Sequence, residues 1–252
     1  MIKNKTEILS SIPDKDDKML ISSVYDKLEQ SIDKNYSSYS DFLDARQLSL
    51  VKRSFGFLKE DLVFYGGILD AERKIVTVMY EYSEIPIKII KIKAPSDITH
   101  RDVLGSIMSL GIKRQKIGDI VIDDFVYIAV KEEISDYIIE NFTQIRHSNI
   151  KPEITDSKSI KREQEFIEIS VTVPSLRIDA VVSAIIHLSR EKSKELIMSG
   201  RVNLNHFELN DNKKLLNLND TISIKGVGRF KLSVINGTTK KDRIKIMVSK
   251  YK

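Results

Sequence analysis

The stretch SLRIDAVVSAIIHLSREKSKELIMSGRVNLN, residues 175–205, determines the expected fold of the C-terminal part of the chain. Its first half repeats apolar residues at the spacing of a core-facing helix, and Ser175 can cap that helix. Ser189 can cap a second helix, which Gly200 ends in a left-handed turn. In Arg201–Asn205, apolar and polar residues alternate as in a strand. We therefore predict two short helices followed by a strand.

Basic residues of the second predicted helix are candidates for contacts to a polyanion. Arg190 and Lys194 lie four residues apart and share one face of the helix, whereas Lys192 lies well round it. Arg201 follows just after the end of the helix. Packing does not require these cations together, and Lys and Arg neutralise the backbone charge of nucleic acids. We therefore interpret the cluster as contacts to phosphate.

The charge of the 252-residue chain is unevenly distributed. The whole chain has a formal charge of +5. Residues 177–252 hold 16 Lys or Arg against 7 Asp or Glu, a net charge of +9, and the preceding 176 residues have a net charge of −4. A small basic module on a mildly acidic body is typical of a protein that binds nucleic acid through one end. The alternative is a charged surface that only keeps the chain soluble.

The composition excludes several classes of protein. The absence of Cys removes disulfides, thiolate zinc sites and cysteine nucleophiles, and no two of the four His residues have the spacing of metal ligands. We therefore expect no metal site. No run of 18 apolar residues could span a membrane. The N-terminal sequence MIKNKTEILSSIPDKDD lacks the apolar core of a secretory signal, so we expect a cytoplasmic protein with no membrane contact.

Residues 1–83 are predicted to form a helical region followed by a β-hairpin. Apolar residues recur at helical spacing, and Ser40 can cap the second helix. The hairpin strands are expected at Leu62–Ile68 and Lys74–Tyr82, on either side of a polar turn. The apolar helix positions are Met19, Leu20, Val24 and Leu28, then Phe42, Leu43, Leu48 and Val51.

Residues 84–150 have the element order β-α-β-β-α-β of ferredoxin-like and RNA-recognition-motif-like domains. Thr99 and Asp102 have the spacing of a capping box, and Gly111 is placed to end that helix. Two segments could supply the last strand, Gln144–Ile150 or Phe166–Val173. The other expected elements are strands at Ile87–Ile92, Gly118–Ile122 and Phe125–Val130 and a helix at Glu132–Asn141.

A polar segment separates the middle domain from the basic module. Residues 151–165 are poor in core residues and are predicted to be a linker, followed by a strand up to residue 173. The basic domain then covers residues 174–252, with further strands at Thr221–Ile224 and after the turn Gly226–Phe230. The expected fold class of the whole chain is α+β.

The basic module resembles the RNA-binding domain named after the fourth protein of the small ribosomal subunit, a small α+β fold. The residues that match its pattern are Arg177, Asp179, Ser189, Arg190, Lys194, Gly200, Val202 and Asn205. His206 and Asn219 stand where that family has turn glycines, and both residue types tolerate positive φ better than most. Asp179 is expected to be a cap or a buried partner.

Three other stretches are similar to the YlmH group of bacterial proteins. They are FLDARQ (residues 42–47), GGILDAERK (66–74) and HRDVLGSIMSLGIKRQKIGDI (100–120). The resemblance covers residues 40 to 235 and implies helices, a recognition-motif-like middle and the basic RNA-binding domain, in that order. It also implies binding to ribosomal RNA of the large ribosomal subunit, with peptidyl-tRNA nearby, in the quality control of stalled ribosomes. We expect the protein to be a monomer.

The candidate RNA-binding residues follow from the cluster and the resemblance. They are Arg177, Ser189, Arg190, Lys192, Lys194, Arg201, Asn203 and Asn205. A second basic group, Lys113, Arg114 and Lys116, could contact RNA or complement the dipole of the preceding helix. Phe125 and Tyr127 alternate as base-stacking aromatics do, but the glycine-aromatic signature is missing, so packing is the favoured role.

No catalytic machinery is recognisable. A pseudouridine synthase needs an aspartate in a G-R-L-D-type loop, and the similar string Arg177-Ile-Asp179 belongs to the binding domain itself. Synthetase signatures, a methyltransferase glycine loop and a P-loop are absent. We therefore predict a non-catalytic RNA-binding protein without a cofactor. The alternatives are a protein-interaction adaptor that uses the acidic N-terminal half and, third, an RNA-modifying enzyme.

Overall fold

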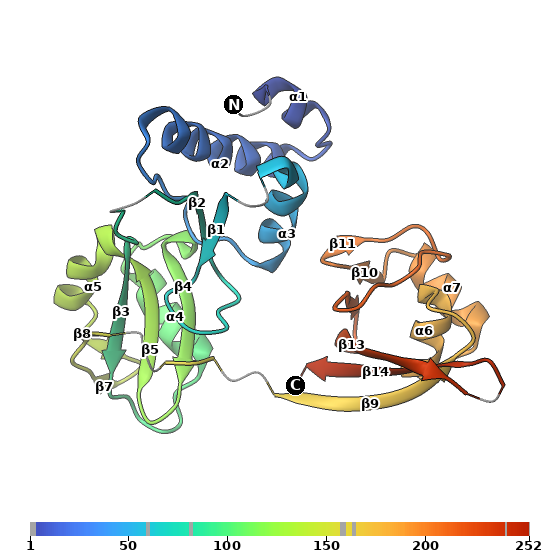
Figure 1. Cartoon of the computed structure of the whole chain (residues 1–252). Helices are drawn as coiled ribbons and strands as arrows, with labels where there is room; N and C mark the ends of the chain where they lie inside the picture. The colour runs from blue at the N-terminus through green and yellow to red at the C-terminus, as the bar shows by residue number, and fades with distance from the viewer. Residues whose placement is uncertain are drawn as a thin grey trace. The chain divides into compact units, whose positions relative to one another are not determined.

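The computed structural model describes residues 4–58, 61–80, 83–156, 160–162, 165–239 and 241–251. The chain forms two compact units, Met1–Glu163 and Gln164–Lys252 (Figure 1). Each unit encloses hydrophobic clusters of its own. The predicted N-terminal region and middle domain therefore belong to one unit, because residues from both fill one of its clusters.

The N-terminal region contains three helices, α1 (Lys5–Ser10), α2 (Lys15–Lys34) and α3 (Ala45–Ser54), followed by the 3-10 turn η1 (Gly56–Leu58). The third helix does not begin at the predicted cap Ser40. Asp44 and Gln47 form a capping box that starts it at Ala45. The hydroxyl of Ser40 instead accepts a hydrogen bond from the backbone N–H of Val76, at 2.9 Å.

The predicted hairpin is confirmed, with shorter strands than expected. Strand β1 (Leu62–Tyr65) pairs antiparallel with β2 (Ile75–Val78). Residues 81 and 82 of the predicted second strand lie outside the described residues.

The middle of the first unit has the predicted order β-α-β-β-α-β. All pairings in its four-stranded sheet are antiparallel, and the strand order is β4-β5-β3-β8. Thr99 and Asp102 form the predicted capping box, and Gly111 follows the helix with a φ of +81°. The elements are β3 (Ile87–Ile92), α4 (His100–Ser109), η2 (Arg114–Lys116), β4 (Ile117–Ile122), β5 (Val126–Lys131), η3 (Glu132–Ile134), α5 (Ser135–Asn141) and β8 (Glu153–Thr155).

Neither segment predicted to close this sheet does so. The closing strand is β8, which lies inside the predicted linker. In the first candidate segment, Arg146 has a φ of +51°, and the chain folds back there as the short hairpin β6 (Gln144–Ile145) and β7 (Ser148–Asn149). The second candidate is β9 (Phe166–Val173), which pairs within the other unit.

The middle sheet is covered on both faces. Residues of α4 and α5, including Ile107 and Ile138, pack with Ile90 and Ile128 on one face. The neighbouring strand residues face the other way, where Ile89 and other side chains meet the N-terminal region. This second face also needs Gly118, because a Cβ atom there would lie 2.7 Å from Cε1 of Phe42.

Two glycine-to-alanine substitutions in this unit are expected to have opposite effects. Gly118→Ala should lower the free energy of unfolding by about 1–3 kcal/mol, because the added methyl group overpacks against Phe42. Gly105→Ala should raise it by about 0.5–1 kcal/mol, because this residue lies inside α4 with open space around its Cα. Urea unfolding followed by circular dichroism measures both. Equal stability of the two variants would contradict the packing described here.

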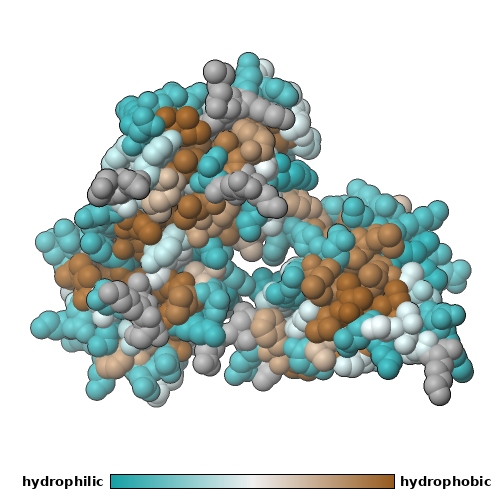
Figure 2. All heavy atoms as spheres, viewed as in Figure 1, coloured by the Kyte–Doolittle hydropathy of each residue, from teal (hydrophilic) through white to brown (hydrophobic). Residues whose placement is uncertain are grey.

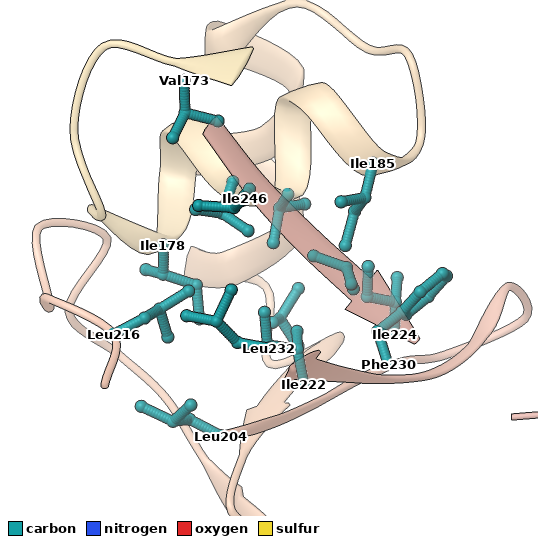
Figure 3. Close-up of a cluster of buried hydrophobic side chains, with 14 of the residues drawn as sticks. Val173, Ile178, Ile185, Leu204, Leu216, Ile222, Ile224, Phe230, Leu232 and Ile246 are labelled. Atoms are coloured by element: carbon teal, nitrogen blue, oxygen red, sulfur yellow. The ribbon is translucent and has the colours of Figure 1, made fainter. Parts of the chain in front are cut away.

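The second unit packs two helices on a six-stranded sheet. The strand order is β11-β10-β12-β13-β14-β9, and all neighbours are antiparallel. Figure 3 shows that side chains from the helices and from several strands meet in one core. The elements besides β9 are α6 (Ile178–Ile185), α7 (Arg190–Met198), β10 (Val202–Leu204), β11 (Phe207–Glu208), β12 (Thr221–Ile224), β13 (Gly228–Thr238) and β14 (Ile244–Tyr251).

The first helix of this unit starts later than expected. Its N-cap is Arg177, without a side-chain cap, so the prediction that Ser175 caps it is wrong. The N–H of Ile178 donates to the backbone carbonyl of Lys214 at 2.9 Å, which replaces the expected side-chain acceptor.

Figure 2 shows a hydrophobic area on one face of this unit, and exposed apolar residues of the unit include Leu215 and Leu218.

The turns of this unit follow the sequence closely. Gly200 ends α7 with a φ of +68°, and Ser189 caps the same helix, as predicted. His206 and Asn219 have φ values of +72° and +70°. Both therefore adopt the left-handed conformation that was expected where the similar domains have glycine.

Candidate nucleic-acid interface

A buried carboxylate organises the start of both helices in the second unit. Asp179 is fully buried, and its oxygens accept hydrogen bonds from Arg177 at 2.9 and 3.1 Å and from Arg190 at 3.1 Å. Burial alone would raise the pKa of Asp179, but the hydrogen bonds from the two guanidinium groups outweigh it and hold this pKa below its ordinary value. The expectation that Asp179 is a buried partner is confirmed.

Arg190 therefore has a role in packing, whereas the sequence indicated a helix face without one. Its guanidinium pairs with Asp179 although 47% of its side chain is exposed, and Arg177 shares this duty with 30% exposed. The sequence spacing could not reveal the pair, because Arg190 and Asp179 come from different helices. Arg190 thus links α7 to α6, and Arg177 holds the same carboxylate at the start of α6, so a substitution of either one affects stability as well as the surface.

Two polar residues among the candidates also have structural roles. Ser189 accepts a hydrogen bond from the N–H of Lys192 at the start of α7. Asn205 has a φ of +50°, donates to Asp220 at 2.8 Å and accepts from the N–H of Thr221 at 2.9 Å. These side chains hold a helix end and a turn in place, which is sufficient to explain them without RNA.

The remaining cations are exposed. Within the described residues, no ion pair or hydrogen bond engages the side chains of Lys192, Lys194 or Arg201. The N–H of Arg201 donates to the carbonyl of Leu196, which places Arg201 against the last turn of α7. Asn203 is half-buried and points to the side of β10 opposite the buried neighbours Val202 and Leu204, and therefore away from the core and its helices.

The fold brings further lysines to these residues that the sequence analysis did not single out. Lys225 is exposed, and its N–H donates to the carbonyl of Arg201 at 2.9 Å. The pairing of β10 with β12 aligns Val202 with Ile224 and so brings Lys225 next to Arg201. The sequence indicated both strands but not their pairing. Lys214 is also exposed, and its backbone contacts the start of α6. We use the name α7 cluster for Lys192, Lys194, Arg201 and Lys225.

The second predicted basic group does not form one exposed surface. The Nη1 of Arg114 donates to the carbonyls of Ile117 and Gly118. Lys116 pairs with carboxylates of Asp41 and Glu133 at 2.6 Å each, and Lys113 is exposed. The group does not complement the dipole of α4 either, because that helix ends at residue 109 without a basic residue in its last turn.

The two aromatic residues of the middle sheet are half-buried, in agreement with the packing role favoured from the sequence. The rings of Phe125 and Tyr127 lie 6.4 Å apart, and Nζ of Lys91 lies 4.1 Å from the centre of the Phe125 ring. Tyr127 packs against the cluster that joins the sheet to the N-terminal region. Part of the face that an RNA-recognition motif exposes is therefore covered here.

Among the described residues, no helix has the length and apolar character that crossing a membrane requires. No three His, Asp or Glu side chains in these ranges are arranged to hold a metal ion.

Comparisons with known proteins place the chain in a family. Residues 81–159 match the family described as "Putative RNA-binding domain in YlmH", a range that includes β8. A solved structure, cell division protein ylmH from Streptococcus pneumoniae, is similar with 17% identity and a TM-score of 0.49, over 59% of this chain and 96% of that chain.

A curated relative gives the broader match. It is the ribosome-associated protein quality control protein P2 of Bacillus subtilis (strain 168), which is 32% identical over 223 residues. The matched region covers 84% of this chain and 87% of the relative. Because this identity extends over most of both sequences and the middle domain matches the family's own domain, the chain belongs to the YlmH family.

Proposed function

We propose that this chain is a non-catalytic RNA-binding protein of bacterial translation that acts in ribosome-associated quality control. The observation that carries the proposal is the α7 cluster, four exposed cations on the unit that contains the basic end of the chain. The family match to an RNA-binding domain and the name of the curated relative support the same function.

The finer assignment of the domains is part of this proposal. The second unit corresponds to the RNA-binding domain of the small-subunit ribosomal-protein type, because its two helices, left-handed stop and following strand occur in the expected order. The middle sheet, with its order β4-β5-β3-β8, corresponds to a ferredoxin-like, recognition-motif-like domain. Its half-covered aromatic face favours the second unit as the main RNA site.

The proposed target is structured ribosomal RNA of the large subunit, with peptidyl-tRNA nearby. Lysine and arginine side chains of the α7 cluster would contact phosphates along the RNA backbone, and each contact would release a counterion. Double-stranded RNA is recognised mainly by shape and by backbone contacts. A rigid pair of short helices held by Asp179 is suited to present cations at a fixed spacing.

Fragments divided at the boundary between the units test the placement of the RNA site. Residues 164–252 hold 16 basic and 9 acidic residues, and residues 1–163 hold 25 and 27. Residues 164–252 keep β9 and its complete sheet, so this fragment should retain most of the affinity for ribosomal RNA. Residues 1–163 should bind this RNA weakly. Binding isotherms at several salt concentrations measure this. Equal affinity of the two fragments would favour the adaptor that uses the acidic half.

A further inference from the structure

The first unit contains a polar pocket that the proposed function does not use. Its volume is about 400 Å³. Three guanidinium groups and one imidazole line it, together with three carboxylates. The lining residues are Asp44, Ala45, Glu72, Arg73, His100, Arg114, Asp119, Ile120 and Arg162.

The pocket assembles the three stretches that resemble the YlmH group. Residues 42–47 contribute Asp44 and Ala45, residues 66–74 contribute Glu72 and Arg73, and residues 100–120 contribute four of the remaining five. Stretches that are far apart in the sequence thus place their charged side chains around one cavity. Only Arg162 comes from elsewhere, namely from the segment predicted to be a linker.

Two of the three carboxylates already accept hydrogen bonds from backbone N–H groups. Asp119 is buried, and its oxygens accept from the N–H groups of Glu72 and Arg73 at 2.7 and 3.0 Å. Asp44 accepts from the N–H of Gln47 at 2.9 Å as the cap of α3. These hydrogen bonds fix the two carboxylates in the walls of the pocket, where Asp119 also lies 3.8 Å from Nε of Arg162.

The guanidinium groups are held in fixed positions. Arg73 donates to the carbonyls of Phe42 and Ile117 at 3.0 and 3.1 Å. All hydrogen bonds of the Arg114 side chain to described residues leave from Nη1, so its other N–H groups are available. Arg162 pairs with Glu72 at 3.1 Å.

Burial in the pocket desolvates the charged groups that line it. Burial, followed by repulsion from Arg73, lowers the pKa of Arg114 to about 10. Burial likewise lowers the pKa of Arg73. Desolvation and the charge of Arg114 lower the pKa of His100, so its imidazole is neutral at pH 7 and can donate one hydrogen bond. An anion bound beside Arg114 would stabilise its charged form.

We propose that this pocket binds a phosphate group, carried either by RNA or by a free nucleotide. The planar forks of Arg114 and Arg162 match the geometry of phosphate oxygens. The volume accommodates a phosphate with part of its attached nucleoside. The inference goes beyond the proposed function and does not depend on it, because the α7 cluster belongs to the other unit.

The test measures binding of adenosine 5′-monophosphate to the full chain by calorimetry, with adenosine as the ligand that lacks the phosphate. We expect the monophosphate to bind and adenosine to bind at least ten-fold more weakly. Arg114→Gln and Arg162→Gln should each lower the affinity for the monophosphate about ten-fold or more. The matched control Arg101→Gln removes an exposed arginine of α4 outside the pocket and should change nothing.

Two further measurements assign the source of the phosphate and the location of binding. A 5′-phosphorylated oligoribonucleotide should displace the monophosphate if the pocket takes an RNA phosphate, and should not if it takes a free nucleotide; both results support the proposal. Removing the cations of the α7 cluster should leave binding of the monophosphate unchanged. Arg162 is partly exposed, so Arg162→Gln reports on binding even if Arg114→Gln is unstable. Unchanged affinity for both ligands in a folded Arg162→Gln variant would overturn the proposal.

Discussion

Replacing Lys192, Lys194 and Arg201 together by alanine is expected to lower the affinity for ribosomal RNA about 100-fold at 0.1 M salt. Each phosphate contact contributes slightly less than one unit to the slope of log K against log[salt], so the slope should fall by about two to three. The loss should be similar for RNAs of different sequence, because phosphate contacts carry no sequence information. The fold should remain intact, since these exposed side chains make no contact that packing requires.

A matched triple variant separates local contacts from net charge. Lys15, Lys27 and Lys34 are exposed residues of α2, and their replacement by alanine removes the same charge from the other unit. This control should change the affinity and the salt slope little. If both triple variants lose affinity equally, the α7 cluster has no special role and only the total charge matters.

Replacing Glu191 and Glu195 by alanine should instead raise the affinity for ribosomal RNA, because these acidic residues lie on α7 beside the cations.

Features with local causes could be predicted from the sequence. The capping box at Thr99 and the left-handed turn at Gly200 depend on residues within a few positions, and both occur as expected. The order of strands and helices in the middle domain was also predictable, because it follows from hydrophobic periodicity. The failures at Ser40 and Ser175 have different reasons. The capping box of Asp44 and Gln47 starts α3 at Ala45, whereas at the start of α6 the carbonyl of Lys214, from a distant segment, accepts the N–H of Ile178.

The roles of the charged residues were less predictable, because they depend on partners that the fold supplies. Sequence spacing treated Arg190 and Lys194 as equivalent, whereas only Arg190 meets the buried Asp179. In the same way, Arg114 and Lys116 looked like surface charges but turn towards carbonyls and carboxylates of other segments. Net charge therefore directed the RNA-binding hypothesis to the second unit, and the individual contacts required the structure.

Removing both arginines that hold Asp179 is expected to destabilise the second unit strongly. The double variant Arg177→Ala with Arg190→Ala leaves a fully buried carboxylate without a partner, which should cost about 3 kcal/mol or more of the free energy of unfolding. Either single variant leaves one guanidinium in place and should cost about 1–2 kcal/mol. Urea unfolding of residues 164–252, followed by circular dichroism, measures these differences.

Adding Asp179→Asn to the double variant distinguishes an unpaired charge from lost packing. The amide has nearly the same shape but no charge, so the triple variant should recover a large part of the lost stability. A triple variant as unstable as the double one would show that the arginines act through packing against α6 and α7. The unmodified unit provides the reference for both.

Acid pH should reveal the same ion pair without any substitution. The pKa of Asp179 in the folded unit lies below its ordinary value of 3.8, because the guanidinium groups stabilise the carboxylate. Such a group contributes stability above its unfolded pKa, and this contribution is lost as the pH falls through the folded value. The free energy of unfolding should therefore decline below about pH 5. It should decline less in the triple variant, which has no carboxyl at this position. Parallel declines would mean that other carboxylates cause the acid sensitivity and that Asp179 is not preferentially stabilised in its charged form.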